Sequence, residues 1–366
     1  MKKILIFSIA YYPFVGGAEV AVKEITDRVR NFSFDMVTLN LGKKLPKFEK
    51  IGNVGVHRIG GGKLLFPILA FIKARRLHRK NGYDLIWSIM ANRAGFAAMF
   101  FKHNFSQIPF VLTLQEGDPI EETERKVKYI YPLFRKIFTL ADHVTAISSY
   151  LANWAKEMRA PSVTIVPNGV DLYKFKISNI KPQNLGGERI IITTSRLVPK
   201  NGIADLISAI KYLPDSIKLW IIGTGPLEEN LKSRISNLKL EDRVKMFGFM
   251  EHAEIIEHLR QADVFVRPSL SEGLGNSFLE AMALGVPIIG TNAGGIPDFL
   301  RDGETGLFCK TKNPRDIAEK VQKMLEGDTL RGRLVNNARM LIEETYDWRE
   351  IAKNMGEIFQ RQLKLS

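Results

Sequence analysis

The chain has 366 residues, of which 45% are hydrophobic and 25% charged, a composition typical of a globular protein and not of a disordered, fibrous or coiled-coil one. The length predicts two domains, and the single cysteine, Cys309, excludes an intramolecular disulfide and a cysteine-ligated zinc site, which favours a cytoplasmic location. The net charge of +14 is compatible with nucleic acid, an anionic membrane surface or an acidic substrate, and by itself selects none of them.

The first half of the chain alternates short apolar runs, rich in β-branched residues, with amphipathic stretches. This alternation is typical of parallel βαβ units whose sheet is covered on both faces. Residues 4–10 pass into aromatic residues and Pro13 without a cleavage site of small residues, so we interpret them as a buried first strand and not as a signal peptide. We predict strands at residues 3–9, 35–39, 54–59, 84–88, 109–114, 142–147 and 163–167.

The second half repeats the pattern after segment 168–188, in which Gly, Asn and Pro accumulate and the apolar periodicity lapses. We interpret that segment as the linker. Further strands are predicted at 189–194, 217–222, 243–247, 263–266 and 286–290, followed by helices from about 313 to 364. No apolar run reaches the roughly 18 residues of a membrane span. The predicted fold class is α/β, with two doubly wound domains that face a cleft and bind ligands beyond the carboxyl ends of their strands.

Two glycines follow the predicted first strand, in the segment YYPFVGGAEVAVKEI. Because Gly16 and Gly17 precede a helical pattern, their backbone N–H groups lie at a helix start, which favours an anion. A plain tight turn is the alternative.

The loop after strand 189–194 holds two cations, Arg196 and Lys200. A guanidinium matches phosphate oxygens in pairs and an ammonium supplies a point charge, although such a pair is also typical of a solvated loop. Gly223 and Gly225 resemble the start of a dinucleotide fingerprint. Glu228 stands where its third glycine belongs, so a nicotinamide site is not expected.

The strongest motif is SEGLGNSFLEAMALGVP, which follows a strand ending at Pro268. Glu272 lies in a glycine-rich loop, and Glu280 lies on a helix that starts near Asn276. Carboxylates accept hydrogen bonds in pairs, which suits sugar hydroxyls, while N–H groups at a helix start suit a phosphate. Acidic residues that only complement the helix dipole are the alternative.

Together these motifs resemble the retaining GT-B glycosyltransferases of family four, which include bacterial mannosyl- and glucosyltransferases of envelope polysaccharide and glycolipid synthesis. The resemblance rests on GGAE at 16–19, PNGVD at 167–171, SRLVPKNG at 195–202, GTGPL at 223–227, FGFM at 247–250, SEGLGNSFLEAMALGVP at 271–287 and NAGGIPDFLRDGETGL at 292–307. It implies a Rossmann-like acceptor-side domain at 1–172, a Rossmann-like nucleotide-sugar-binding domain at 173–346, and a last helix, about 347–366, that packs back on the first domain.

The resemblance also implies residue roles. Glu272 would bind the donor sugar, and Arg196 and Lys200 would bind the diphosphate. These three residues form the implied catalytic group. Glu280 would bind the ribose, and the strand end at Gly248 and Phe249 would meet the base. The implied donor-binding set comprises Gly16, Gly17, Gly248, Phe249, Gly275, Asn276, Ser277 and Glu280. The implied reaction proceeds with retention and without a metal ion or cofactor, and the sequence contains no Asp-x-Asp.

Two positions depart from the family pattern. Asn201 stands where relatives carry a lysine, and we hypothesise that Lys200 reaches the diphosphate through a shifted loop. Gln115 stands where many relatives carry a histidine, and it cannot change protonation near neutral pH. Gln115 and Asp118 are predicted contacts of the acceptor or sugar, with a turn role for Asp118 as the alternative.

Most of the excess positive charge lies in the first half, where residues 1–175 hold 26 Lys and Arg against 14 Asp and Glu, a net +12 of the chain's +14. Segments 63–80 and 125–138 mix cations with large apolar residues, which predicts peripheral binding to an anionic membrane surface. A core helix with a solvated basic edge is the alternative.

The predicted function is therefore transfer of a hexosyl group from a nucleotide-diphosphate sugar to a lipid-linked or cell-envelope saccharide, in the cytoplasm at the inner face of the membrane. The alternative is a sugar-nucleotide-binding protein with weak or no transferase activity. A nucleic-acid partner is not expected, because no recognition motif accompanies the charge.

Overall fold

The computed structural model describes residues 1–42, 45–175 and 187–365, and these fall into two compact units. The first unit comprises residues 1–168 and the last helix, and the second comprises residues 169–347. The division falls at residue 168 and not at the predicted 172. Val170 belongs to the second unit because it forms a bridge with Asp347 and donates its N–H to the Tyr346 carbonyl oxygen (2.8 Å). Of the predicted linker, residues 176–186 lie outside the described residues.

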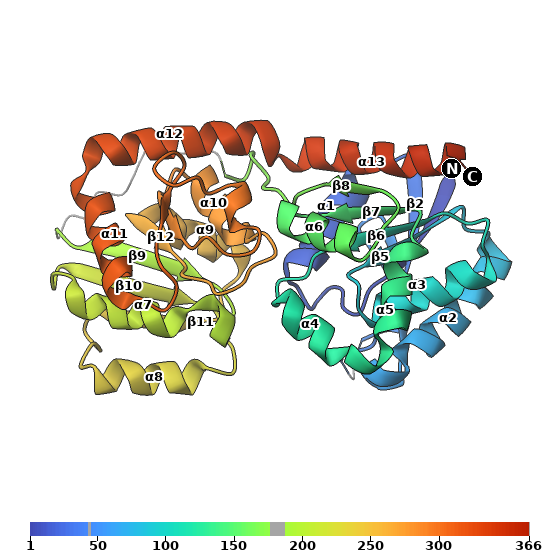
Figure 1. Ribbon diagram of the computed structural model, residues 1–366, viewed down its shortest axis with the longest axis horizontal. Coiled ribbons are helices and arrows are strands. Elements are labelled where there is room, and N and C mark those ends of the chain that lie inside the picture. Colours follow the sequence, from blue (N-terminus) through green and yellow to red (C-terminus); the bar gives the residue numbers. More distant parts are fainter. Residues whose placement is uncertain (43–44, 176–186, 366) are drawn as a thin grey trace. The chain divides into compact units, whose positions relative to one another are not determined.

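The sheet of the first unit has the order β3-β4-β2-β1-β5-β6-β7-β8 and is parallel except for β3 (Figure 1). Its buried strands are short apolar runs, as in LIWSI and FVLTL, which a sheet covered on both faces requires. The strands are β1 (Lys2–Phe7), β2 (Phe32–Leu39), β3 (Phe48–Ile51), β4 (Val54–Ile59), β5 (Leu85–Ile89), β6 (Phe110–Leu114), β7 (His143–Ala146) and β8 (Val163–Ile165).

Helices cover both faces of this sheet. They are α1 (Gly17–Arg28), α2 (Gly62–Asn81), α3 (Arg93–Asn104), α4 (Ile120–Lys126), α5 (Tyr131–Thr139), α6 (Ser149–Glu157) and α13 (Trp348–Leu365), with a 3-10 turn η1 (Lys128–Ile130) before α5. On one face α1 and α13 share a core with the central strands, where Phe359 packs edge-on against Trp87 and Phe32. On the other face α2 and α3 cover the sheet, and α5 packs on α3.

The sheet of the second unit is parallel throughout, in the order β11-β10-β9-β12-β13-β14. Its strands are β9 (Arg189–Thr194), β10 (Ile217–Ile222), β11 (Val244–Gly248), β12 (Val264–Val266), β13 (Ile288–Gly290) and β14 (Leu307–Phe308). Its helices are α7 (Ile203–Ala209), α8 (Glu228–Asn237), α9 (His252–Gln261), α10 (Asn276–Ala283), α11 (Pro314–Glu326) and α12 (Asp328–Thr345). The faces of α7, α8 and α11 that meet the sheet form one continuous apolar core with it.

Each sheet has one point where the strand order reverses. In the first unit β1 lies between β2 and β5, and in the second unit β9 lies between β10 and β12. Open parallel sheets bind ligands beyond the carboxyl ends of the strands at such a reversal. The loops after β1 and β5 in the first unit, and those after β9 and β12 in the second, are therefore where each unit is expected to bind ligands. None of the helices in the described ranges is long and apolar enough to cross a bilayer.

Candidate functional site

In the second unit, the loops after β9 and β12 are joined directly. The Leu270 N–H donates to the carbonyl oxygen of Lys200 (2.6 Å), so the loop of the glutamate motif is tied to the loop of the two cations. Gly202, with a φ of +68°, makes this approach possible, because a Cβ there would lie 2.1 Å from the carbonyl oxygen of Pro268. The two motifs thus meet at one edge of the sheet.

Glu272 is held by a buried arginine. The Nη2 of Arg267, the residue after β12, donates to the Glu272 Oε2 (2.7 Å), and the side chains of the two residues are only 6% and 16% exposed. The Nη1 of Arg267 donates to the Ser277 Oγ (2.6 Å), and its guanidinium lies over the Phe278 ring, 4.6 Å from the centroid. The arginine therefore links the Glu272 loop to the first turn of α10.

The charge of Arg267 depends on its acidic neighbours. Burial lowers the pKa of the Arg267 guanidinium, while the carboxylates of Glu272 and Glu280 raise it. A buried cation is stable only when it is paired and hydrogen-bonded. Its Nε has no hydrogen-bond partner among the described residues. The pairing orients the Glu272 carboxylate, whose second oxygen, Oε1, accepts a hydrogen bond from the Gly273 N–H (3.2 Å).

The start of α10 approaches this ion pair closely. Gly275 precedes the helix with a φ of +100°, and a Cβ there would lie 2.8 Å from the Arg267 Nη2 and 2.9 Å from the Phe278 ring. Asn276 and Ser277 form the first turn, where a helix offers backbone N–H groups that it does not use itself. A carboxylate for hydroxyls and a helix N-terminus for an anion therefore lie side by side.

Glu280 lies on the second turn of α10 and contacts a histidine. The His252 Nε2, at the start of α9, is 3.0 Å from the Glu280 Oε1. The His252 ring also packs on the buried Phe175, with centroids 5.9 Å apart. The contact fixes one oxygen of Glu280 at the same edge of the sheet.

The two cations in the loop after β9 differ in how far they are exposed. Arg196 is exposed, and Lys200 is half-buried in the 3-10 turn η2 (Pro199–Asn201). The Asn201 side chain points inward, where its Nδ2 donates to the Arg196 carbonyl oxygen (2.7 Å) and its Oδ1 is buried without a hydrogen-bond partner among the described residues. Asn201 therefore shapes the loop backbone.

Gly223 and Gly225 serve close packing against this loop. A Cβ at Gly223 would lie 1.9 Å from the Ser195 carbonyl oxygen, and one at Gly225 would lie 2.5 Å from that of Leu197. At the next strand, β11 ends at Gly248, whose φ is +72°, and Phe249 follows with 73% of its surface exposed. An exposed aromatic ring at a strand end is suited to stacking on a flat base.

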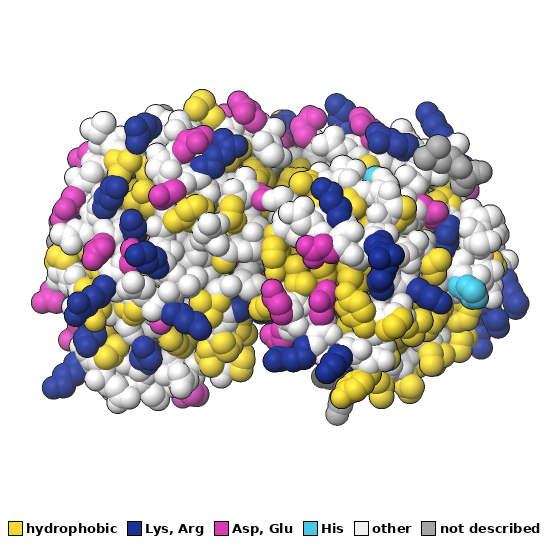
Figure 2. Space-filling model, in the orientation of Figure 1, with side chains coloured by type: hydrophobic (Ala, Val, Ile, Leu, Met, Phe, Trp, Pro, Cys, Tyr) yellow, Lys and Arg dark blue, Asp and Glu magenta, His cyan; other side chains and the backbone are white. Residues whose placement is uncertain are grey.

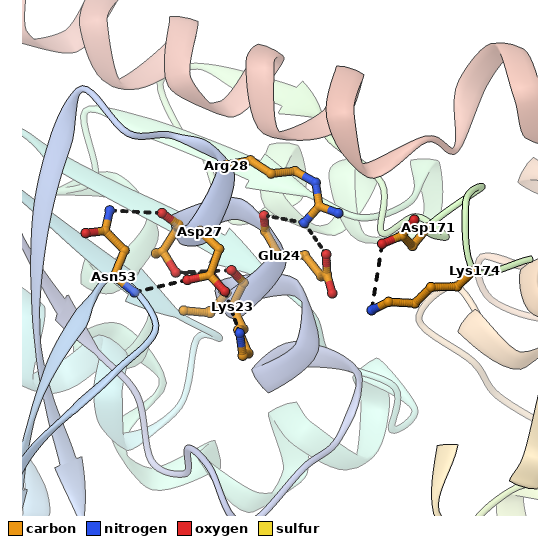
Figure 3. A network of polar contacts seen from close by, with 9 residues as sticks. Lys23, Glu24, Asp27, Arg28, Asn53, Asp171 and Lys174 are labelled. Atoms are coloured by element: carbon orange, nitrogen blue, oxygen red, sulfur yellow. Dashed lines mark hydrogen bonds and ion pairs between the residues drawn. The ribbon is translucent and has the colours of Figure 1, made fainter. Parts of the chain in front are cut away.

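In the first unit, the loop after β1 leads to Gly16 and Gly17, which are exposed at the start of α1. The Gly16 N–H donates to the Glu19 carboxylate (2.8 Å), so an anion binds that N–H only by displacing Glu19. Further along α1, Asp27 pairs with Lys23 and accepts the Asn53 N–H (3.0 Å), which ties the helix to the turn between β3 and β4 (Figure 3).

The loop after β6 holds Gln115, Glu116 and Asp118. Gln115 is buried, and its Oε1 accepts a hydrogen bond from the Asn168 Nδ2 (3.0 Å), while Asp118 is exposed. The Glu116 carboxylate accepts the N–H groups of Ala91, beyond β5, and Gln115 (2.5 and 2.9 Å). Burial raises the pKa of Glu116 to about 7, and the nearby charge of Asp118 raises it by a smaller amount. The hydrogen bonds from the backbone N–H groups lower this pKa, but by less than burial raises it.

Profiles of two sequence families match consecutive parts of the chain. The family described as Glycosyltransferase Family 4 matches residues 15–174, and the family described as Glycosyl transferases group 1 matches residues 175–341. The chain belongs to glycosyltransferase family four. As a family-four enzyme it has the GT-B fold and uses nucleotide-sugar donors.

Individual proteins agree with this assignment. An uncharacterized glycosyltransferase of Methanocaldococcus jannaschii is 27% identical over 365 residues, which covers 98% of each chain. The putative colanic acid biosynthesis glycosyltransferase WcaL of Escherichia coli is 28% identical over 68% of this chain and 64% of its own. The structure of Anabaena HepE in complex with UDP-glucose superposes with a TM-score of 0.84 at 21% identity, covering 99% of this chain and 100% of that one.

Three residues that contact predicted site residues or lie beside them, Arg267, His252 and Glu116, are not among the site residues that the sequence predicts. Arg267 stands inside the apolar run VFVRPS, and a charge in a buried run was the available signal. No local sequence pattern indicates His252, because its partner, Glu280, is 28 residues away along the chain. Within the described parts of this glycosyltransferase, no three His, Cys, Asp or Glu side chains gather closely enough to hold a metal ion.

Proposed function

We propose that this enzyme transfers a hexosyl group, with retention and without a metal ion, from a nucleotide-diphosphate sugar to a lipid-linked or cell-envelope saccharide. The observation that carries the proposal is the Glu272 carboxylate, fixed by Arg267 beside the N-terminus of α10. This pairing suits a donor whose sugar hydroxyls and diphosphate are adjacent groups.

Each part of the donor has a matching group in the second unit. Glu272 accepts hydrogen bonds from the sugar hydroxyls, while Arg196, Lys200 and the N–H groups at Gly275, Asn276 and Ser277 meet the diphosphate. Glu280 accepts hydrogen bonds from the ribose, and Phe249 stacks on the base. Gly16 and Gly17, in the first unit, remain predicted donor-binding residues, and the Gly16 N–H can bind an anion only once Glu19 has been displaced.

The reaction breaks the bond between the anomeric carbon and the diphosphate oxygen and forms a bond to the acceptor hydroxyl on the same face. The acceptor proton passes to the departing phosphate, so no protein nucleophile is needed. Negative charge grows on the leaving group in the transition state, and catalysis depends on donors aimed at it. The cations and helix N-terminus take the place that a metal ion holds in other transferases, which supports metal independence.

The proposed acceptor is a saccharide of the cell envelope or one linked to a lipid, and the enzyme acts on it at the inner face of the membrane. Support comes from the name of the relative WcaL, a putative enzyme of colanic acid biosynthesis. Gln115 and Asp118, beyond β6, are the proposed contacts for acceptor or sugar hydroxyls. Gln115 binds them as an amide, without a change of protonation.

Donor binding is tested by a thermal-shift screen of UDP-, GDP- and ADP-sugars, in which a ligand at 100 times its Kd stabilises the protein by about 2.7 kcal/mol. Glu272→Gln is expected to lower the affinity for the nucleotide sugar towards that for the nucleotide diphosphate alone. Glu280→Gln, in α10, is expected to weaken the binding of both ligands equally. If no nucleotide sugar raises the melting temperature, the proposal is wrong.

Transfer is tested with radiolabelled donor and a lipid extract. The anomeric configuration of the product, measured by NMR, decides retention, and an unchanged rate in EDTA decides metal independence. Donor binding without transfer to any saccharide or lipid acceptor favours the alternative, a sugar-nucleotide-binding protein. That alternative is motivated by Asn201 and Gln115, which replace charged or titratable groups.

A further inference from the structure

One carboxylate of the first unit joins two loops at the carboxyl edge of the sheet. The Glu116 Oε1 accepts the N–H of Ala91 (2.5 Å) in the loop after β5, and its Oε2 accepts the N–H of Gln115 (2.9 Å) in the loop after β6. Each carboxylate oxygen thus binds one backbone donor, which suits the ionised form, because that form only accepts hydrogen bonds. The proposed function gives Glu116 no role.

The loop after β5 turns sharply at the point that Glu116 holds. Met90 has a φ of +70°, in the left-handed region that a side chain disfavours. Its N–H donates to the Thr113 carbonyl oxygen on β6 (2.8 Å), and the next N–H, that of Ala91, donates to Glu116. Ala91 is only 2% exposed, so a loss of this hydrogen bond would leave its N–H buried. Strained backbone of this kind persists only where its surroundings fix it, and it is frequent at functional sites.

The strands below these loops are fixed independently of Glu116. The Trp87 Nε1 on β5 donates to the Thr113 Oγ1 on β6 (2.7 Å), and that hydroxyl is also hydrogen-bonded to the Thr145 Oγ1 on β7 (2.6 Å). All three side chains are buried. A change at Glu116 is therefore expected to alter the two loops more than the sheet.

In the loop after β6, Glu116 fixes the backbone of a predicted contact residue. Gln115 is 7% exposed, and its Oε1 accepts a hydrogen bond from the Asn168 Nδ2 (3.0 Å). Its side-chain oxygen is thus held by Asn168 and its backbone N–H by Glu116, and the Nε2 group supplies the donors of the amide. A group that is oriented before its ligand arrives binds that ligand with a smaller loss of entropy.

Other acidic residues of this segment lie nearer the surface. Asp118 is exposed, and Glu121 and Glu122 stand on the first turn of α4. Figure 2 shows acidic side chains at the surface where Figure 1 draws the start of α4. Glu116 instead directs its carboxylate to two backbone N–H groups, so it differs from these residues in what it binds.

The charge of Glu116 changes near neutral pH. Burial and, to a smaller extent, the Asp118 carboxylate raise its pKa to about 7. Residues 90–92 and 147–149, which follow the neighbouring strands β5 and β7, are uncharged, and Arg93 at the start of α3 is exposed. An ionised acceptor forms shorter and stronger hydrogen bonds than a neutral one. The two loops are therefore joined most firmly above about pH 7.

We propose that Glu116 is a positioning residue of the transfer reaction, whose carboxylate joins the loops after β5 and β6 and so holds the Gln115 amide in place for the acceptor. We call Glu116, Ala91 and Gln115 the loop clamp. The effect of the clamp on acceptor binding rests on the proposed function. The clamp itself rests only on the hydrogen bonds of the first unit.

Transfer to a lipid extract tests the effect on the acceptor, with the radiolabelled UDP-, GDP- or ADP-sugar that gives the largest thermal shift as donor. In Glu116→Gln the side chain keeps its shape, but only its oxygen can accept an N–H. At about pH 8.5 we expect this variant to need about tenfold more extract for half the maximal rate, with an unchanged KM for the donor. At about pH 5.5, where Glu116 is neutral, the difference should shrink to about twofold or less.

The sign of the pH dependence separates positioning from a merely structural role. The unchanged protein should need less extract as the pH rises through about 7, although burial of the Glu116 charge makes the fold less stable over the same range. A residue that acted only through stability would give the opposite trend. A requirement for extract that is the same in Glu116→Gln and in the unchanged protein at both pH values overturns the proposal.

Asp142→Asn is the matched control, at the other end of β6. The Asp142 Oδ2 accepts the Phe110 N–H (2.7 Å) and pairs with Lys102 (2.7 Å), so it is also a carboxylate that holds backbone of β6. This variant is expected to lower the melting temperature without changing the amount of extract required or its pH dependence. If it raises that amount as much as Glu116→Gln does, general destabilisation explains the effect and the proposal is wrong.

Hydrogen exchange without substrates tests the clamp directly. At about pH 8.5, amides in the loops after β5 and β6 are expected to lose about tenfold of their protection in Glu116→Gln, while β6 and β7 keep theirs. Equal protection of these loops in both proteins overturns the clamp. If the loops respond as expected but the unchanged protein transfers no sugar, the proposed function fails and the clamp stands. The two failures are thus distinguishable.

Discussion

The ion pair of Arg267 and Glu272 joins a buried guanidinium to a carboxylate that remains partly exposed. Such a pair adds little stability by itself, because desolvation of both charges offsets their attraction. Its effect lies in orientation, since the guanidinium also binds Ser277 and stacks on Phe278. The Glu272 carboxylate is therefore preorganised before any ligand arrives, which lowers the entropic cost of binding a sugar.

Removal of one partner of this pair is expected to be costly. Arg267→Met leaves the Glu272 carboxylate half-desolvated without a cation, so we expect it to lower the free energy of unfolding by about 3 kcal/mol. Arg267→Met/Glu272→Gln removes both charges and should recover most of that loss. Urea unfolding curves measure both values. A double variant no more stable than the single one would show that the pair does not act as a unit.

Glu116 gives the protein a pH-dependent stability of a particular sign. Its pKa is raised from 4.5 to about 7 by burial, so the folded state holds the proton more tightly than the unfolded state. This stabilisation is complete below about pH 4.5 and is lost as the pH rises through about 7, by up to about 3 kcal/mol. The stability of the unchanged protein relative to Glu116→Gln should therefore fall between pH 4.5 and 8. Equal pH slopes of the two unfolding free energies would contradict this.

Single residues also show which contacts the sequence alone can predict and which it cannot. The glutamate motif and the cationic loop were found because their residue types and spacing are specific, and both lie at the strand-order reversal of the second unit. Arg267 and His252 contact residues that the fold brings close to them, and no local sequence pattern indicates such pairs. Asn201 stands where the family pattern has a lysine, and its amide has a structural contact with the Arg196 backbone instead.

At the scale of elements, the start of α10 depends on one glycine. Gly275→Ala forces a side chain into a φ of +100° and places its Cβ 2.8 Å from the Arg267 Nη2. We expect it to displace the ion pair and to lower kcat/KM at least tenfold, beyond the strain of about 1 kcal/mol that the backbone alone causes. Gly303→Ala is the matched control, because Gly303 has a φ of +72° with no atom within 4 Å of its Cβ. If both variants lose the same activity, backbone strain alone explains the effect.

The predicted strands match those observed where a run is buried on both faces, as in β5, β6 and β9. Two strands were missed. β3 is an antiparallel edge strand whose side chains are all at least partly exposed, so the sequence FEKI has no apolar run to reveal it. β14 has two residues and depends on pairing with β13, which is a tertiary contact. Edges of sheets are thus where local pattern carries the least information.

At the scale of the whole molecule, each unit has its own hydrophobic core, and the core of the first unit combines residues from both ends of the chain. The last helix, α13, returns to the first unit, where Trp348, Met355 and Phe359 complete the core that α1 and the central strands begin. Its apolar residues recur every three or four positions, which is the period of a helix face that packs on a core. The nucleotide motifs lie almost entirely in the second unit. Because the two cores share no residues, we expect the two units to unfold separately.

This division predicts two separable unfolding transitions. Phe359→Ala removes a fully buried ring at the contact of α13 with Trp87, and it should destabilise the first unit by about 3–5 kcal/mol. UDP at 100 times its Kd should raise the transition of the second unit by an amount equivalent to about 2.7 kcal/mol. Calorimetry with and without UDP assigns each transition, because the substitution should move one and the ligand the other. A single transition that both treatments shift equally would mean that the two cores unfold as one cooperative unit.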